Sequence, residues 1–218
     1  MLRALPSLIV AGLLGCSATR LPATHPDSNP ARLLELRTGL FVPAAALKCE
    51  MRANLWSGGS EVDFSLVART SGNELRLAGL TDLGGTLFQL RGSDGSFEVL
   101  QRAPFLDDEF LVETLACGLA PILQRANVAA LELVHFASAR PGLRGESGER
   151  ELLLACSDAG AVEEYWVGRE GRLTAHVQIE TWTRGAAGAF PRRLTLVDGP
   201  GRTRVTIQVL SWTEVGGP

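Results

Sequence analysis

The sequence predicts a mainly β protein, with a large antiparallel sheet of about eleven strands and one main helix. Apolar and polar residues alternate with a period of two along most of the chain. Pairs of turn-forming residues such as Gly-Gly, Gly-Asn and Asp-Gly separate the alternating segments. A helical period appears in only one longer segment near the middle. With 218 residues, 45% of them hydrophobic, the chain can build a sizeable core.

The N-terminus is a short apolar run that ends on a cysteine. Residues 5–14 form a mostly apolar run that is too short to span a bilayer as a helix, which favours a secretory signal. The string Leu-Leu-Gly-Cys at residues 13–16 resembles the lipobox of bacterial lipoproteins. This resemblance implies that residues 1–15 are removed and that Cys16 is acylated with fatty acyl chains such as palmitate. Ser17 in place of aspartate implies sorting to the outer membrane, with the domain facing the periplasm. A plain signal peptide with a chance cysteine is the alternative.

Residues 16–30 are expected to form a lipidated, flexible tether. Pro22, Pro26 and Pro30 stand among small polar residues, and this stretch has almost nothing to bury. When extended, it reaches at most about 50 Å, from roughly 3.3–3.6 Å per residue. Residues 31–218 are then expected to form a folded domain close to the membrane surface.

The first half of this domain is expected to be a short helix followed by an antiparallel meander. Pro30 suits a first helical turn and Gly39 suits a C-cap, which predicts a helix over residues 30–37. Strands are then predicted at 47–55, 62–68, 75–77, 88–90 and 97–99, because apolar residues alternate there.

The second half is expected to be one helix followed by six strands. Residues 107–124 carry apolar side chains at helical spacing, with acidic residues at the start, and Pro121 is expected to kink or shorten the helix. The six strands are predicted at 131–136, 151–157, 162–167, 173–183, 194–197 and 205–212. No internal repeat or linker divides the domain.

The sequence offers no constellation typical of an enzyme or a metal site. Adjacent Glu163 and Glu164 are expected to point to opposite faces of a strand. His135 and His176 are expected at the surface or rim of the domain. No cofactor and no metal are therefore predicted. The 21 basic and 24 acidic residues are interspersed, which argues against nucleic acid as a partner.

Three cysteines fall within the predicted domain. Cys49 and Cys156 lie on the apolar faces of their strands, and Cys117 lies in the helix expected to cover them. One disulfide with one remaining thiol is compatible with this pattern, and so are three buried thiols.

The apolar face of such a sheet must be shielded from water, and a single helix is too small to shield all of it. Either side chains fill the interior, or an apolar pocket remains. The sequence resembles the outer-membrane lipoproteins related to LolB over roughly residues 40–215. The resemblance lies in the order of the elements, the string from Thr81 to Phe88, the pair Asp94-Gly95, and Pro104 before the helix. The resemblance implies the LolA/LolB-like fold, an unclosed half-barrel of eleven antiparallel strands with helices over its open side. It also implies a cavity for the acyl chains of a lipid or lipoprotein.

Two sets of residues follow from this resemblance. The side chains expected to line the lipid cavity are Met51, Phe64, Leu66, Leu77, Phe88, Val177 and Ile179. Leu83, in the loop between the third and fourth strands, matches the residue that inserts into the membrane in LolB. A buried turn residue is the alternative for Leu83.

Two functions from different classes remain open. The first is an outer-membrane lipoprotein that acts as carrier or acceptor in envelope lipid or lipoprotein transport, with a periplasmic carrier protein as a candidate partner. The second is a non-catalytic structural or interaction lipoprotein of an envelope assembly, with a filled core. Neither is an enzyme.

Overall fold

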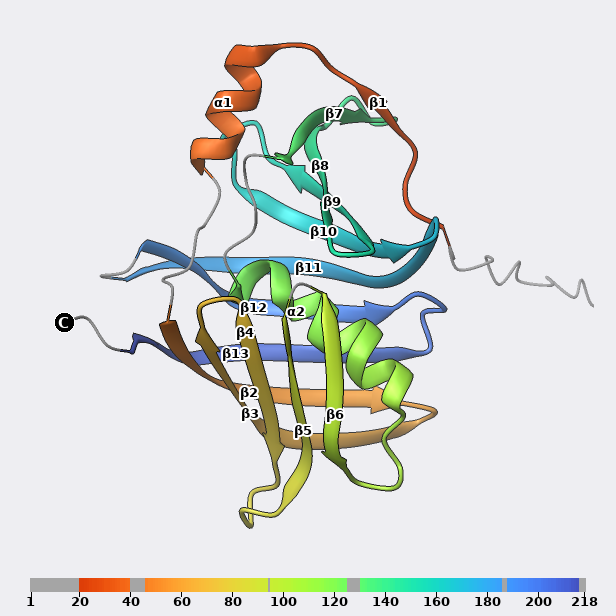
Figure 1. Ribbon diagram of the computed structural model, residues 1–218, viewed down its shortest axis with the longest axis vertical. Helices are drawn as coiled ribbons and strands as arrows, with labels where there is room; N and C mark the ends of the chain where they lie inside the picture. The colour runs from red at the N-terminus through yellow and green to blue at the C-terminus, as the bar shows by residue number, and fades with distance from the viewer. Residues whose placement is uncertain (1–19, 40–45, 94, 125–129, 186–187, 216–218) are drawn as a thin grey trace, which may run out of the picture.

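The computed structural model describes residues 20–39, 46–93, 95–124, 130–185 and 188–215 (Figure 1). These residues form thirteen strands: β1 (Thr24–Pro26), β2 (Ala46–Ser57), β3 (Ser60–Ser71), β4 (Glu74–Leu80), β5 (Thr86–Ser93), β6 (Ser96–Arg102), β7 (Glu132–Phe136), β8 (Pro141–Ser147), β9 (Arg150–Cys156), β10 (Val162–Arg169), β11 (Arg172–Gly185), β12 (Gly188–Asp198) and β13 (Thr203–Glu214). Cys16 lies outside the described residues.

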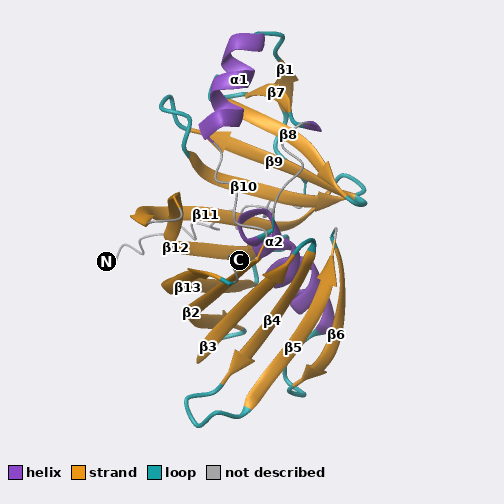
Figure 2. Cartoon of the chain, turned by 60° about the vertical axis from the view of Figure 1, so that its left-hand side comes forward, coloured by secondary structure: helices purple, strands orange, loops and turns teal. Residues whose placement is uncertain are grey.

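All thirteen strands belong to one antiparallel sheet. Their order is β1-β7-β8-β9-β10-β11-β12-β13-β2-β3-β4-β5-β6, so β1 and β6 are the two edges. The edges do not pair with each other, and the sheet curves without closing, as Figures 1 and 2 show. The predicted unclosed antiparallel sheet is confirmed, with two strands more than expected.

Strand β8 was not predicted because its glycines interrupt the alternation. A side chain at Gly142 would place a Cβ atom 2.4 Å from the ring of Phe136, and one at Gly145 would lie 2.3 Å from Leu131. Both glycines therefore make room for apolar neighbours that pack across the strand.

Strand β1 was not predicted because it lies in the stretch expected to be a flexible tether. It pairs with β7, with Thr24 opposite Phe136 and Pro26 opposite Val134. Pro26 fits there because an edge strand does not need every backbone N–H for pairing. The described part of the expected tether is thus attached to the sheet.

The helices are α1 (Pro30–Gly39), η1 (Phe110–Ala116) and α2 (Cys117–Leu123). Helix α1 matches the prediction and lies against β7 and β8. The predicted second helix is present as η1, wound as a π-helix, which continues directly into α2. It crosses the concave side of the sheet in both views (Figures 1 and 2). Pro121 lies inside α2, which ends two residues later. Among the described residues, no helix is long and apolar enough to cross a bilayer.

The main core lies between this helix and the concave face. Its buried residues come from most strands of the sheet and from η1 and α2, and they form one contiguous cluster. Cys49, Cys117 and Cys156 are all buried in this cluster as free thiols. Burial raises the pKa of Cys49 and of Cys117 to about 12 and that of Cys156 to about 11. The structure thus has three buried thiols rather than a disulfide.

Candidate functional site

The seven side chains expected to line a lipid cavity all lie inside the sheet. None is more than 8% exposed, and all seven belong to the main core cluster: Met51, Phe64, Leu66, Leu77, Phe88, Val177 and Ile179. Phe64 and Phe88 pack edge to face, with ring centroids 5.8 Å apart. The alternation therefore assigned these residues to the correct face. Their contact with a lipid stays a prediction.

Helix α2 lies close to the sheet at Gly118. A Cβ atom at this position would lie 2.8 Å from Leu196 and 3.5 Å from Ala175. The hydroxyl of Tyr165, on β10, donates a hydrogen bond to the carbonyl of Gly118. Tyr165 is fully buried, and burial raises the pKa of its phenol above the ordinary range. This contact fixes the height of the helix above the sheet.

A buried ion pair fixes the other part of the helix. Arg150, on β9, is 7% exposed and donates through two nitrogens to the carboxylate of Glu113 on η1. Its Nε also donates to the carbonyl of Gly95, in the turn between β5 and β6, at 2.9 Å. Thr114 adds a hydrogen bond to the carbonyl of Thr174 on β11. Arg150 therefore joins both halves of the sheet to the helix that lies between them.

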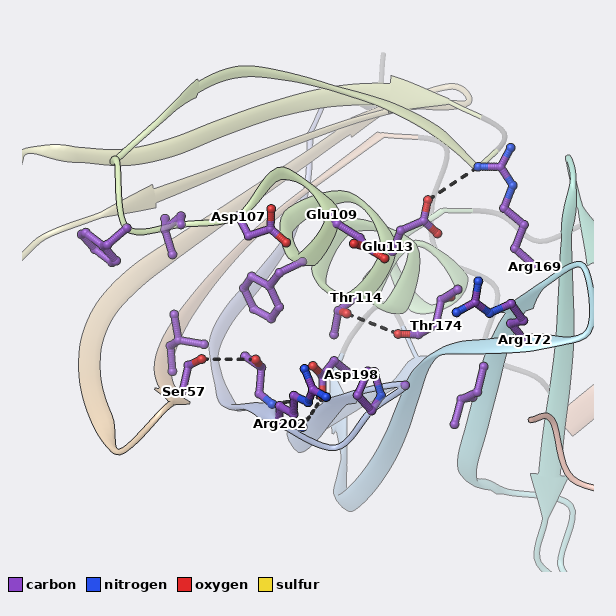
Figure 3. Close-up of a pocket in the computed structure, with 18 of the residues that line it drawn as sticks. Ser57, Asp107, Glu109, Glu113, Thr114, Arg169, Arg172, Thr174, Asp198 and Arg202 are labelled. Atoms are coloured by element: carbon purple, nitrogen blue, oxygen red, sulfur yellow. Dashed lines mark hydrogen bonds and ion pairs between the residues drawn. The ribbon is translucent and has the colours of Figure 1, made fainter. Parts of the chain in front are cut away.

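A large opening lies beside the start of this helix, and we call it the end pocket (Figure 3). Its volume is about 950 Å³, at the upper end of the roughly 300–1,000 Å³ usual for ligand sites. The apolar residues in its wall are Leu55, Val62, Phe105, Leu106, Phe110 and Leu173. Leu55 and Leu106 also belong to the core cluster, so the apolar wall continues into the interior.

Charged groups line the end pocket on two sides. Asp107, Glu109 and Glu113 lie along the start of the helix, whereas Arg172 and Arg202 come from the turns of the sheet (Figure 3). Within the described chain, neither arginine forms an ion pair with a carboxylate. The pocket therefore combines an apolar wall with a polar mouth, which is the environment that an amphiphile requires.

None of the seven predicted cavity residues lines the end pocket. The residues that do line it come from the neighbouring ends of β2 and β3, of β10 and β11 and of β12 and β13, from the segment before η1 and from η1 itself. Only the strand order brings these segments together. Phe110 was predicted on the apolar face of the helix, but nothing in the sequence indicated that it would reach an opening.

Leu83 lies at the tip of the loop between β4 and β5 and is 99% exposed. The loop is well defined: Gly84 donates to the carbonyl of Thr81 at 2.9 Å and has a φ of 80°. Glycine adopts this left-handed conformation without strain. The alternative of a buried turn residue is therefore wrong, while insertion of Leu83 into a membrane stays a prediction.

A polar cluster lies on the convex face of the sheet. Arg140 pairs with both Glu163 and Glu164, and Glu164 also contacts His176 at 2.9 Å. The prediction that the two glutamates point to opposite faces was wrong, because the β9–β10 register shifts between Val162 and Glu164. Among the described residues, no group of three or more His, Cys, Asp or Glu side chains could hold a metal ion.

Comparison with solved structures identifies the fold. A LolA superfamily protein from Nitrosomonas europaea is similar with a TM-score of 0.59 and 11% sequence identity, over 88% of this chain and 96% of that chain. The chain has a LolA-type fold. An outer membrane lipoprotein-sorting domain from Vibrio parahaemolyticus has a TM-score of 0.53 and 8% identity, over 86% of this chain and 92% of that chain. A DUF1329 family protein from Desulfovibrio piger has a TM-score of 0.50 and 7% identity, over 86% and 91%.

The LolA-type fold confirms the predicted architecture. No family model matches the sequence, and no curated protein is similar to it at the sequence level. At identities of 7–11%, the likeness establishes the fold and assigns no role to any residue.

Proposed function

We propose that this protein is a lipid-anchored carrier or acceptor that binds acyl chains of a lipid or lipoprotein between its sheet and its helix. In this proposal, Cys16 holds the protein on the periplasmic side of the outer membrane, and the domain performs no reaction. The observation that supports it most directly is the end pocket, whose apolar wall continues into the core of a LolA-type fold.

The geometry suggests how a chain would enter. The apolar end of an amphiphile would contact Leu55, Val62 and Phe110 first, while its head stays near Arg172 and Arg202. Deeper entry would require the helix to move away from Phe64, Phe88 and their neighbours, because these side chains are packed and buried. The helix would thus act as a plug that an acyl chain displaces.

The energy available is sufficient for reversible binding. Burial of about ten methylene groups contributes roughly 8 kcal/mol at about 0.8 kcal/mol each, before the cost of association is subtracted. Displacing the helix lowers this value further. A net 8 kcal/mol would correspond to a dissociation constant of about 1 μM, so after both costs are subtracted we expect dissociation constants weaker than about 1 μM.

The test is a titration of the Cys16→Ser protein with a fluorescent fatty acid. The substitution Phe110→Asn should weaken binding about tenfold, since loss of apolar contact and a buried amide together cost at least about 1.4 kcal/mol. Phe97→Asn is the matched control, because Phe97 packs against the same core but does not line the end pocket. Equal binding by both variants and the parent would contradict a site at the end pocket.

The filled interior supports a second candidate, a structural or interaction lipoprotein of an envelope assembly. All seven predicted cavity residues are buried in one packed cluster. If this candidate is correct, the titration gives no binding with any of several fatty acids and phospholipids.

A further inference from the structure

The chain that leads to the predicted lipid anchor joins the domain beside the end pocket. Arg20 forms a β-bridge with Arg172, which is a lining residue of that pocket. Leu21 packs against the small buried cluster of Phe136, Leu153 and Ala155 and lies next to Gly168. Further along, His135 contacts Asp27, and the backbone N–H of Asp27 donates to the carbonyl of Leu133. The segment from Arg20 to Asp27 is thus held on the sheet by backbone and side-chain contacts.

This attachment shortens the reach of the anchor. From Cys16 to Arg20 the chain extends over four residues, which span at most about 14 Å at 3.3–3.6 Å per residue. The full stretch of residues 16–30 would reach about 50 Å by the same measure. A lipid on Cys16 would therefore keep the bilayer near the β10–β11 turn, not merely near the domain as a whole.

The surface around this turn suits a membrane. Arg172 and Arg202 are exposed at the mouth of the end pocket, and neither has an ion-pair partner in the described chain. Phe105, at the same mouth, is 62% exposed, and Trp56 next to the β2–β3 turn is 45% exposed. Basic side chains attract anionic headgroups, and aromatic side chains favour the membrane interface.

Packing within the domain does not cover Phe105, since most of its surface faces solvent. The rim also carries the exposed carboxylates of Asp107, Glu109 and Glu170. Asp198 is already engaged, since it accepts hydrogen bonds from the backbone N–H groups of Arg202 and Thr203. Among the residues that the structure describes, no carboxylate pairs with either guanidinium group, so both can bind an external anion.

We propose that the lipid bilayer contacts the rim formed by Phe105, Arg172 and Arg202, so that the end pocket opens directly onto the membrane surface. The proposal rests on lipidation of Cys16, which belongs to the proposed function. It assigns the principal membrane contact to the rim and not to Leu83, whose loop projects from another corner of the sheet in both views (Figures 1 and 2). An acyl chain could then pass between bilayer and pocket without crossing water.

The test uses the lipidated full-length protein in vesicles of phosphatidylethanolamine and phosphatidylglycerol. Cysteine is introduced by Phe105→Cys, Arg202→Cys, Leu83→Cys or Leu210→Cys in four separate variants, and each is labelled with an environment-sensitive fluorophore. The three described native cysteines are buried and stay unlabelled. Leu210 is the control, because it is an exposed leucine, 61% accessible, outside the end pocket. Spin-labelled lipids then quench any probe that touches the bilayer.

We expect quenching at positions 105 and 202 to exceed that at position 210 by at least about twofold, as for side chains buried at the interface. Quenching at 105 and 202 no greater than at 210 would overturn the proposal, whatever is seen at 83. Intact mass and a fatty-acid titration of the same samples separate the two proposals. An acylated protein that binds fatty acid but shows no quenching at the rim refutes only the orientation. One that is quenched at the rim but binds no fatty acid refutes only the carrier function. A protein without an acyl group on Cys16 refutes the anchoring on which both rest.

Discussion

Replacing Arg150 by methionine would leave Glu113 without its main partner under the sheet. The guanidinium of Arg150 contacts both carboxylate oxygens of Glu113 and the carbonyl of Gly95. Burial lowers the pKa of Arg150, but the hydrogen bond to Glu113 together with the charge interactions with Cys117, Glu113 and Glu149 outweighs it and holds the pKa above its ordinary value. Methionine keeps the apolar length of the side chain, so the substitution removes mainly the polar contacts.

The structure sets the size of the effect. Breaking a buried ion pair costs about 3–5 kcal/mol when one charge is left alone. The side chain of Glu113 is 19% exposed and keeps Arg169 at 3.8 Å. We therefore expect a smaller loss, at or below the lower limit of this range: about 2–3 kcal/mol of the free energy of unfolding. For a chain of this size, that loss lowers Tm by about 4–12 °C, at about 2–4 °C per kcal/mol.

A double-mutant cycle measured by urea unfolding tests this reasoning. Arg150→Met combined with Glu113→Leu removes both charges, and the double variant should recover most of the lost stability, with a coupling energy of about 1 kcal/mol or more. If the free energy of unfolding of Arg150→Met lies within about 0.5 kcal/mol of that of the parent protein, the ion pair does not hold the helix. A double variant no more stable than the single one would lead to the same conclusion.

Three further predictions concern single positions. Leu83→Glu should leave Tm unchanged in scanning calorimetry, because Leu83 is 99% exposed. Leu77→Glu, at a site that is 2% exposed, should lower the free energy of unfolding by several kcal/mol. Equal losses of stability in the two variants would refute the loop geometry. The thiols of Cys49, Cys117 and Cys156 should not react with a thiol reagent at pH 8 until the protein is unfolded, because pKa values of about 12, 12 and 11 keep them protonated; rapid reaction of the folded protein would contradict their burial. Cys16→Ser should give an exported protein that is released from the membrane and no longer incorporates labelled fatty acid, and a wild type without label would end the lipoprotein interpretation.

The alternation of apolar residues predicted most of the sheet because each of those strands has one buried and one solvated face. Strand β2 illustrates this, since its buried and less buried residues alternate almost throughout. Strand β8 was not predicted because Gly142 and Gly145 allow neighbouring side chains to approach closely and contribute no apolar side chains to the alternation. Strand β1 is only three residues long and depends on its partner β7, which lies more than a hundred residues away.

The candidate site was only partly predictable. The burial of Phe64 and Val177 follows from local periodicity, whereas the two glycines after Leu83 were compatible with an exposed or a buried side chain, and only the structure shows that it is exposed. The end pocket does not follow, because Arg172, Arg202 and Phe105 belong to turns and connections that only the strand order brings together. Local patterns specify which face a residue occupies, but an opening between distant turns is a property of the whole sheet.

The most direct test of the acyl-chain carrier is native mass spectrometry of the Cys16→Ser protein purified from the envelope of its host without detergent. A carrier that is occupied in the envelope should retain a lipid during purification without detergent, so the spectrum should show a mass above that of the bare chain. Collisional activation should release the lipid, and Phe110→Asn should reduce the bound fraction while the Phe97→Asn control does not. A spectrum that contains only the bare protein, even after incubation with fatty acids and phospholipids, would contradict the central claim.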